Sequence, residues 1–288
     1  MSLLVAPSLL AAAAPAVVSA AAAPGSAAGI LPEAVLALLP ADERLASLDP
    51  SEAGTRIMRA VEQAQDGFGD LTVDLTMVLR SRSGRETERA LTIAQLEVEG
   101  DGDLTLVTFE RPKAIRGTGL LSHAHPSRDD DQWLYLPALR RVKKIGARNR
   151  SGPFLGSEFA FEDLTSTPVE KFEDRYLRRE ACAKDECYVI NRRPLDAFSG
   201  YQRQTLWVDT QGLRVLRIEY FDRQERLKKT LVADDFEQHQ DRFWRPRRME
   251  MTNARTGKST LLYWQYFRYS TGLSASRDFS VNALQRVR

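Results

Sequence analysis

The chain has 288 residues, of which 43% are hydrophobic and 28% are charged, with 41 Lys and Arg against 39 Asp and Glu. This length suits one large domain or two small ones, with room for a sizeable core. The net charge of +2 excludes a generally polybasic protein of the kind that binds nucleic acid non-specifically, so any basic function must be local.

The first 27 residues form an apolar, Ala-rich segment that contains no charged residue. Small residues around Ala20 and Ala27 offer cleavage points, so residues 1–27 are predicted to be a secretory signal peptide, although its usual basic start is missing. A transmembrane anchor is the alternative, but it needs about 20 strongly apolar residues, and Pro7, Pro15 and Pro24 interrupt this segment. Residues 28–48 are predicted to be a linker.

A helix is predicted to start at Asp49, which can cap it, with Pro50 at the first helical position and apolar residues at three-to-four spacing from Ala53 to Ala64. Gly67 and Gly69 end it. From Leu71 to Leu79 the pattern changes to strict alternation of apolar and polar residues, which predicts a long half-buried strand.

The rest of the chain has short alternating or apolar segments separated by turn residues, which predicts further strands. We expect an antiparallel meander of about ten strands in a single domain, 49–288, mainly β with helices near the start and around Arg111–Ser122. Beyond the first strand, the predicted strands are 86–99, 104–109, Gln132–Leu136, Cys187–Asn191, Gln204–Asp209, Arg214–Phe221, Leu227–Phe236, Phe243–Asn253 and Ser259–Tyr269.

The two cysteines, Cys182 and Cys187, are separated by a short polar stretch. In an exported chain, such a close pair predicts a disulfide at the tip of a hairpin. Two alternatives stay open from the spacing: a metal site, for which two thiolates without a nearby His supply only half the ligands, and two reduced thiols in a turn.

Reactive side chains are scarce, so the sequence does not indicate an enzyme. Nucleophile-elbow, phosphate-loop and zinc-protease motifs are absent from the sequence. His123 and His125 with Asp129 resemble a partial metal site, but a solvated loop is the preferred interpretation. No cofactor and no metal is expected.

Several strands carry more apolar and aromatic residues than one buried face requires, which favours a curled sheet around a small-molecule cavity. The alternative for any single residue is ordinary core packing. In "GPFLGSEFAFEDL" the flanking glycines also allow a mobile loop that carries aromatic rings into the cavity. The candidate cavity residues are Leu75, Met77, Trp133, Tyr135, Phe154, Phe159, Phe161, Ile218, Tyr220 and Trp264.

The stretch "DQWLYLPALRRVKKI", followed by "SGPFLGSEFAFEDL", "LWVDTQGLRVLRIEYFD", "LKKTLVADDF", "FWRPRRMEMTNARTGKSTLL" and "DFSVNALQR", resembles the outer-membrane lipoprotein-sorting protein family of LolA-like periplasmic carriers. The resemblance extends from about Asp49 to the end and is most specific between Trp133 and Leu164. It is strongest to a branch often encoded beside RND-type exporters.

This resemblance implies a LolA- and LppX-like open antiparallel half-barrel whose helices cover a hydrophobic cavity, without catalytic residues. It implies a monomeric periplasmic carrier of lipid or lipoprotein acyl chains that works with an outer-membrane receptor or an inner-membrane RND-type exporter and does not bind nucleic acid. The alternative is a non-catalytic docking subunit of such an exporter with a vestigial cavity.

The basic residues that follow Pro137 are expected to lie where the chain leaves the sheet, since proline ends a strand ladder. Arg140, Arg141, Lys143 and Lys144 are predicted to meet anionic lipid headgroups, a membrane surface or an acidic partner. A solvated basic hairpin without a partner is the alternative.

Overall fold

The computed structural model describes residues 31–39, 42–45, 47–182 and 185–286. The predicted signal peptide, 1–27, lies outside these ranges. The described helices are α1 (Glu33–Leu36), α2 (Asp42–Leu45), α3 (Pro50–Gln65), α4 (Ala275–Asp278) and α5 (Val281–Leu284), and the strands are β1 (Asp70–Arg80), β2 (Glu86–Leu96), β3 (Leu104–Arg111), β4 (Gly119–His123), β5 (Asp131–Leu136), β6 (Arg141–Ile145), β7 (Phe172–Cys182), β8 (Asp185–Pro194), β9 (Arg203–Asp209), β10 (Val215–Phe221), β11 (Leu227–His239), β12 (Phe243–Asn253) and β13 (Ser259–Tyr269).

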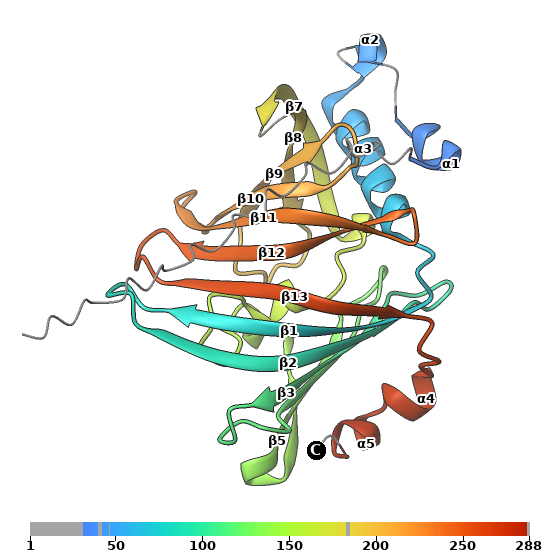
Figure 1. The fold of residues 1–288 in the computed structure, drawn as a ribbon. Coiled ribbons are helices and arrows are strands. Elements are labelled where there is room, and N and C mark those ends of the chain that lie inside the picture. The colour runs from blue at the N-terminus through green and yellow to red at the C-terminus, as the bar shows by residue number, and fades with distance from the viewer. Residues whose placement is uncertain (1–30, 40–41, 46, 183–184, 287–288) are drawn as a thin grey trace, which may run out of the picture.

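All 13 strands belong to one antiparallel sheet, in the order β6-β5-β4-β3-β2-β1-β13-β12-β11-β10-β9-β8-β7. The sheet curls but does not close, so β6 and β7 are its two edges (Figure 1). The alternation predicted in β1 is confirmed: its buried residues Leu71, Val73, Leu75 and Met77 alternate with partly exposed ones. We call the face that carries these four side chains the inner face.

Helix α3 covers the inner face of β8 and β9 and the edge of β7. The Asp49 carboxylate caps it by accepting hydrogen bonds from the amides of Ser51 and Glu52, as predicted. Its buried side chains pack against residues of β8 and β9 such as Ile190 and Leu206. Gly54 allows the close approach to β7, because a Cβ there would lie 2.7 Å from backbone atoms of residues 174–176.

The other half of the inner face is covered by residues 150–164, which we call the inner segment. Phe154 and Phe159 are almost fully buried, and Phe154 contacts the rings of Phe109 and Phe161 at centroid distances of 5.7 and 5.5 Å. These aromatic rings pack with Leu75, Met77 and other residues of the inner face. The inner segment therefore covers the half of the inner face that α3 leaves uncovered.

The outer face is covered locally by the C-terminal helices α4 and α5. Phe279 and Leu284 are buried against Leu104 of β3 and Leu121 of β4, and the carbonyl oxygen of Phe279 lies 2.8 Å from Nε2 of His123. Gly119 leaves the space for Leu284, whose Cδ1 would lie 2.6 Å from an added Cβ. The strands β3 to β5 are therefore buried on both faces.

Two parts of the sequence-based fold are wrong. The helix expected around Arg111–Ser122 is a turn followed by β4, a short strand whose first four residues are all buried. Such a strand shows no alternation of buried and exposed residues, so periodicity cannot distinguish it from a helix. The expected ten strands are 13, because β4, β6 and β7 were missed. β6 and β7 are edge strands with polar, charged sequences, so they lack the apolar alternation of a half-buried strand.

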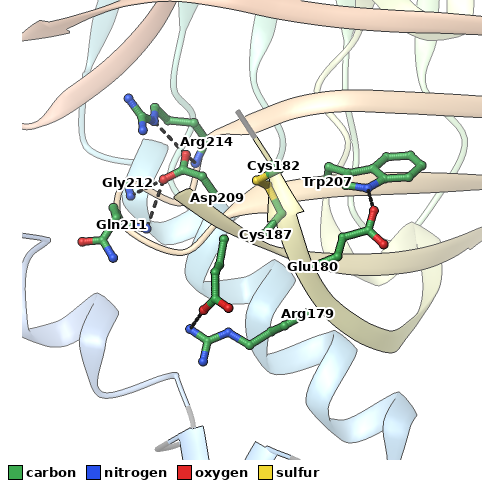
Figure 2. The surroundings of a disulfide bond; sticks show 10 residues. Arg179, Glu180, Cys182, Cys187, Trp207, Asp209, Gln211, Gly212 and Arg214 are labelled. Atoms are coloured by element: carbon green, nitrogen blue, oxygen red, sulfur yellow. Dashed lines mark hydrogen bonds and ion pairs between the residues drawn. A yellow bond between two sulfur atoms is a disulfide. The ribbon is translucent and has the colours of Figure 1, made fainter. Parts of the chain in front are cut away.

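The segment predicted to be a linker, 28–48, contains α1 and α2, whose Val35 and Leu45 are buried against α3 and its neighbours. At the far end of the β7–β8 hairpin, Cys182 and Cys187 form the predicted disulfide (Figure 2). Nearby, the indole of Trp207 donates a hydrogen bond to Glu180, and Asp209 accepts hydrogen bonds from the Gly212 amide and the Arg214 guanidinium. The disulfide and these bonds tie β7, β8 and β9 together at the same end.

Candidate functional site

A cavity of about 1340 Å³ lies between α3, the inner face of β8 to β12 and residues 162–172. It occupies the space between the two elements that cover the inner face, α3 on one side and the inner segment on the other. The turns at 66–69, 97–103 and 126–130 line one part of it, which we call its mouth, and residues 194–196 and 199 of the β8–β9 connection line another part. The mouth therefore lies at the end of the sheet where α3 finishes and β1 begins.

The floor and one wall of the cavity are apolar. Inward side chains two positions apart contribute to it, such as Ile218 and Tyr220 of β10 and Leu231 and Ala233 of β11, and α3 adds two apolar side chains. The apolar lining consists of Met58, Val61, Leu206, Val215, Ile218, Tyr220, Leu231, Ala233, Phe236 and Met249. Such a surface binds hydrocarbon chains through the hydrophobic effect.

The mouth is acidic. Both oxygens of Glu97 accept hydrogen bonds, from the amides of Gly67 and Gly69 at 2.6 Å, and both glycines have positive φ angles that favour this residue. Burial, and then the nearby charges of Glu97 and Asp66, raise the pKa of Asp103 to about 7. Burial also raises the pKa of Asp66 and of Glu62.

A buried ion pair stands where the cavity meets the inner segment. The ammonium of Lys229 donates to the Asp163 carboxylate at 2.7 Å and to the carbonyl oxygen of Glu158 at 3.0 Å, and the charged side chains are only 4% and 6% exposed. The hydroxyl of Tyr201 also donates to Asp163 at 2.9 Å. This network fixes the inner segment on β11 and on the turn between β8 and β9.

Eight of the ten candidate cavity residues occupy three places. Ile218 and Tyr220 line the cavity. Leu75, Met77, Phe154, Phe159 and Phe161 pack in the cluster beneath the inner segment. Trp264 belongs to the edge of that cluster and lines a smaller pocket of about 380 Å³.

Trp133 and Tyr135 lie on the opposite face of β5 from Leu134. Leu134 is buried in the inner cluster, whereas the two aromatic residues pack on the outer face with Phe279 and Leu284. The ring of Trp133 also contacts His123, with the centroids 5.1 Å apart. The alternation predicted for this strand is present. The element that covers Trp133 and Tyr135 is the C-terminal segment.

The four basic residues lie on the β5–β6 hairpin. Arg140 is in the turn and Arg141, Lys143 and Lys144 are in the edge strand β6, and all four are exposed. Lys144 is not free, since its ammonium contacts Asp131 at 2.7 Å and lies over the Trp133 ring. Arg140, Arg141 and Lys143 therefore form the accessible part of this group.

The two histidines of "SHAHP" have separate structural contacts. His125 is buried, contrary to the solvated loop predicted for it, and its Nδ1 lies 2.8 Å from an oxygen of Asp101. His123 contacts the C-terminal segment instead. Among the residues that the structure describes, no group of three or more His, Cys, Asp and Glu side chains is placed to hold a metal ion, and no helix is long and apolar enough to cross a membrane.

Sequence reasoning missed most of the cavity lining. Met58 and Val61 lie on α3 and Leu231 and Met249 on adjacent strands, and each looks like ordinary core in the sequence. The acidic mouth had a local signal, four acidic residues within "EVEGDGD", but its meaning depends on the turn lying beside the end of α3.

The comparisons with known proteins agree on one fold. A family model described only as an uncharacterized protein matches residues 101–286. An outer membrane lipoprotein-sorting protein domain from Vibrio parahaemolyticus is 42% identical over 82% of this chain and all of that one, with a TM-score of 0.80. A DUF1329 family protein from Desulfovibrio piger is 28% identical over the same shares, with a TM-score of 0.78.

A more distant solved structure is similar in fold alone. The LolA superfamily protein from Nitrosomonas europaea is 19% identical over 80% of this chain and 98% of that one, with a TM-score of 0.65. A search of curated proteins gives no match. The half-barrel architecture is thus shared by chains whose sequences have diverged widely.

Proposed function

Since the chain belongs to the outer membrane lipoprotein-sorting protein family, we propose that it is a non-catalytic periplasmic carrier that holds acyl chains of lipids or lipoproteins in its cavity. The observation that carries the proposal is the apolar floor of that cavity, which α3 and residues 162–172 shield from solvent on two sides. Each methylene buried there stabilises the complex by about 0.8 kcal/mol. Export by the predicted signal peptide would place the carrier in the periplasm.

The shape of the site supports this function. A floor of apolar side chains fixes the length and width of a ligand and leaves its chemical identity open. Charged groups lie at the mouth, where the polar end of an acylated ligand would remain in contact with water, and also along the wall at Asp163 and Arg192. Release would then require a receptor or a change in cavity shape.

The exporter-associated docking subunit stays the second candidate. The accessible basic residues Arg140, Arg141 and Lys143 on an edge strand favour it, because charged edge residues commonly set the orientation of a partner. In that case the cavity would be vestigial and would not retain a ligand.

Filling the cavity tests the carrier proposal. Ala233 lines the cavity and Val232, its neighbour on β11, is 40% exposed, so Ala233→Trp places an indole inside and Val232→Trp places one outside. For Ala233→Trp we expect about tenfold weaker binding of a fluorescent fatty acid, because displacing two methylene groups costs about 1.6 kcal/mol.

Val232→Trp is the matched control and should bind the fatty acid as the unmodified chain does. Circular dichroism and thermal unfolding would establish that both variants are folded. Binding that is equal in the two variants, or no binding by the unmodified chain, would argue against the carrier and for the docking subunit.

A further inference from the structure

The two ends of the sheet have opposite charge. In an antiparallel sheet successive hairpin turns alternate between its ends, so the turns 81–85, 112–118, 137–140, 195–202, 222–226 and 254–258 share one end, which we call the basic end. These six turns contain nine Lys and Arg and three Asp and Glu, a net charge of +6. In Figure 1 the β1–β2 and β12–β13 hairpins turn at this end, on the left.

The opposite end is acidic and carries the cavity mouth. Its described turns, 66–69, 97–103, 124–130, 210–214 and 240–242, contain eight acidic and three basic residues, a net charge of −5. The molecule as a whole has a net charge of only +2, so the separation of charge along the strands is not visible in the composition.

The positive charge at the basic end is available to a partner. Its three acidic residues are already neutralised, because Asp196 pairs with Arg150, Asp222 with Arg226 and Glu225 with Arg203. In contrast, eight exposed basic side chains at this end form no ion pair within the described residues: Arg82, Arg85, Lys113, Arg116, Arg140, Arg223, Arg255 and Lys258.

Four of the six turns form one continuous surface. The amide of Ala254 donates to the carbonyl oxygen of Lys228 at 3.0 Å, and the guanidinium of Arg223 donates to the carbonyl oxygen of Ala197 at 2.7 Å. Gly257 lies against Arg82, whose Cγ would be 3.6 Å from an added Cβ. Contacts therefore join the turns 81–85, 254–258, 222–226 and 195–202 in sequence across the end.

Exposed apolar side chains lie among these charges. Of the eight large hydrophobic residues that are strongly exposed in the described chain, four are at the basic end: Leu139, Leu195, Phe198 and Leu227, with 63%, 54%, 40% and 40% of their surface accessible. Basic residues interspersed with exposed apolar ones are typical of surfaces that lie in the interface of an anionic bilayer.

We propose that the basic end docks on an anionic bilayer surface, with the cavity mouth pointing away from it. The inner segment lies just inside this end, where Arg89 donates to the carbonyl oxygen of Leu155 and Asn253 donates to the carboxylate of Glu158. A docked molecule therefore presents the inner segment to the membrane and leaves the acidic mouth free for a second protein. Of the six turns only 195–202 also lines the cavity, through Leu195, Asp196, Ser199 and Tyr201, whereas the turns 81–85 and 254–258 contribute no residue to it.

Vesicle binding by the full chain tests this orientation. The unmodified chain should sediment with vesicles of phosphatidylethanolamine and phosphatidylglycerol, not with phosphatidylcholine vesicles, and salt should weaken the binding. The variant Arg82→Ser/Arg85→Ser/Arg255→Ser/Lys258→Ser should partition at least roughly tenfold less, since each basic residue contributes several-fold near an anionic surface.

The matched control removes the same charge elsewhere, with Arg59→Ser/Arg178→Ser/Arg247→Ser/Arg277→Ser, and should bind the vesicles within about twofold of the unmodified chain, because these residues lie outside the basic end. Both variants should retain fatty-acid binding, which separates this proposal from the carrier function.

Three results would overturn the proposal: no binding to the anionic vesicles, an equal loss in both variants, or undiminished binding by the basic-end variant. If the unmodified chain forms salt-sensitive oligomers and does not bind vesicles, the basic end would instead bind the acidic end of a second copy.

Discussion

Replacing Lys229 with methionine is expected to lower the free energy of unfolding by about 3 to 5 kcal/mol, because it leaves the Asp163 carboxylate buried without its cation. Both side chains are almost fully buried, and Lys229 is also bonded to the Glu158 carbonyl oxygen. The Tyr201 hydroxyl cannot replace the charge. Burial and the Asp163 charge raise its pKa well above the usual value, so it stays neutral.

Urea unfolding would measure the loss. Lys258→Met is the control, since Lys258 is exposed, and it should change the unfolding free energy by less than about 0.5 kcal/mol. The double variant Lys229→Met/Asp163→Asn should recover part of the stability, because it no longer buries an unpaired charge. A single variant as stable as the control would contradict the role assigned to this pair.

Because of Asp103, the unfolding free energy should fall by roughly 2 kcal/mol between about pH 4 and about pH 7. This fall is smaller than the full pKa shift of Asp103 implies, since the carboxyl faces the cavity mouth and water screens it there. Its pKa is raised from the ordinary 3.8 to about 7. Between these values the folded chain holds a proton that the unfolded chain has lost, so raising the pH favours unfolding. Above about pH 7 this contribution is constant.

Unfolding measured across this pH range in Asp103→Asn should show a shallower slope and greater stability at about pH 8. Glu99→Gln, an exposed carboxyl of the same turn, should keep the original slope. Carboxyls with lowered pKa values, such as Asp131 at about 2, lose their stabilising effect only at lower pH. Equal slopes in Asp103→Asn and the unmodified chain would show that Asp103 is not buried as described.

The sequence predicts strands well where one face is buried and the other is solvated. β1 follows its predicted alternation residue by residue, and β12 and β13 have the predicted bounds. The prediction missed β4 for the opposite reason. α5 covers the outer face of this strand and the inner cluster covers its other face, so the alternation disappears. The prediction missed β7 because α3 packs against this edge strand without requiring apolar residues along it.

The site is harder to predict than the fold. Its residues resemble core residues in the sequence, and they line a cavity only because no other element packs on them. Ile218 and Tyr220 were identified, since they lie on a strand of the half-barrel. Phe154 and Phe159 were aromatic candidates of the same kind, yet they fill half of the inner face themselves. Whether an inward side chain lines a cavity depends on the path of residues 150–172. The alternation of apolar and polar residues in the strands does not predict that path.

Native mass spectrometry of the protein, purified without detergent from a periplasmic extract, tests the carrier function most directly. The carrier proposal predicts a mass increase from stoichiometric lipid, which organic extraction removes and lipid analysis identifies as acyl-chain-containing. A ligand-free mass that stays unchanged after incubation with membranes would contradict it and would leave the cavity without a cargo.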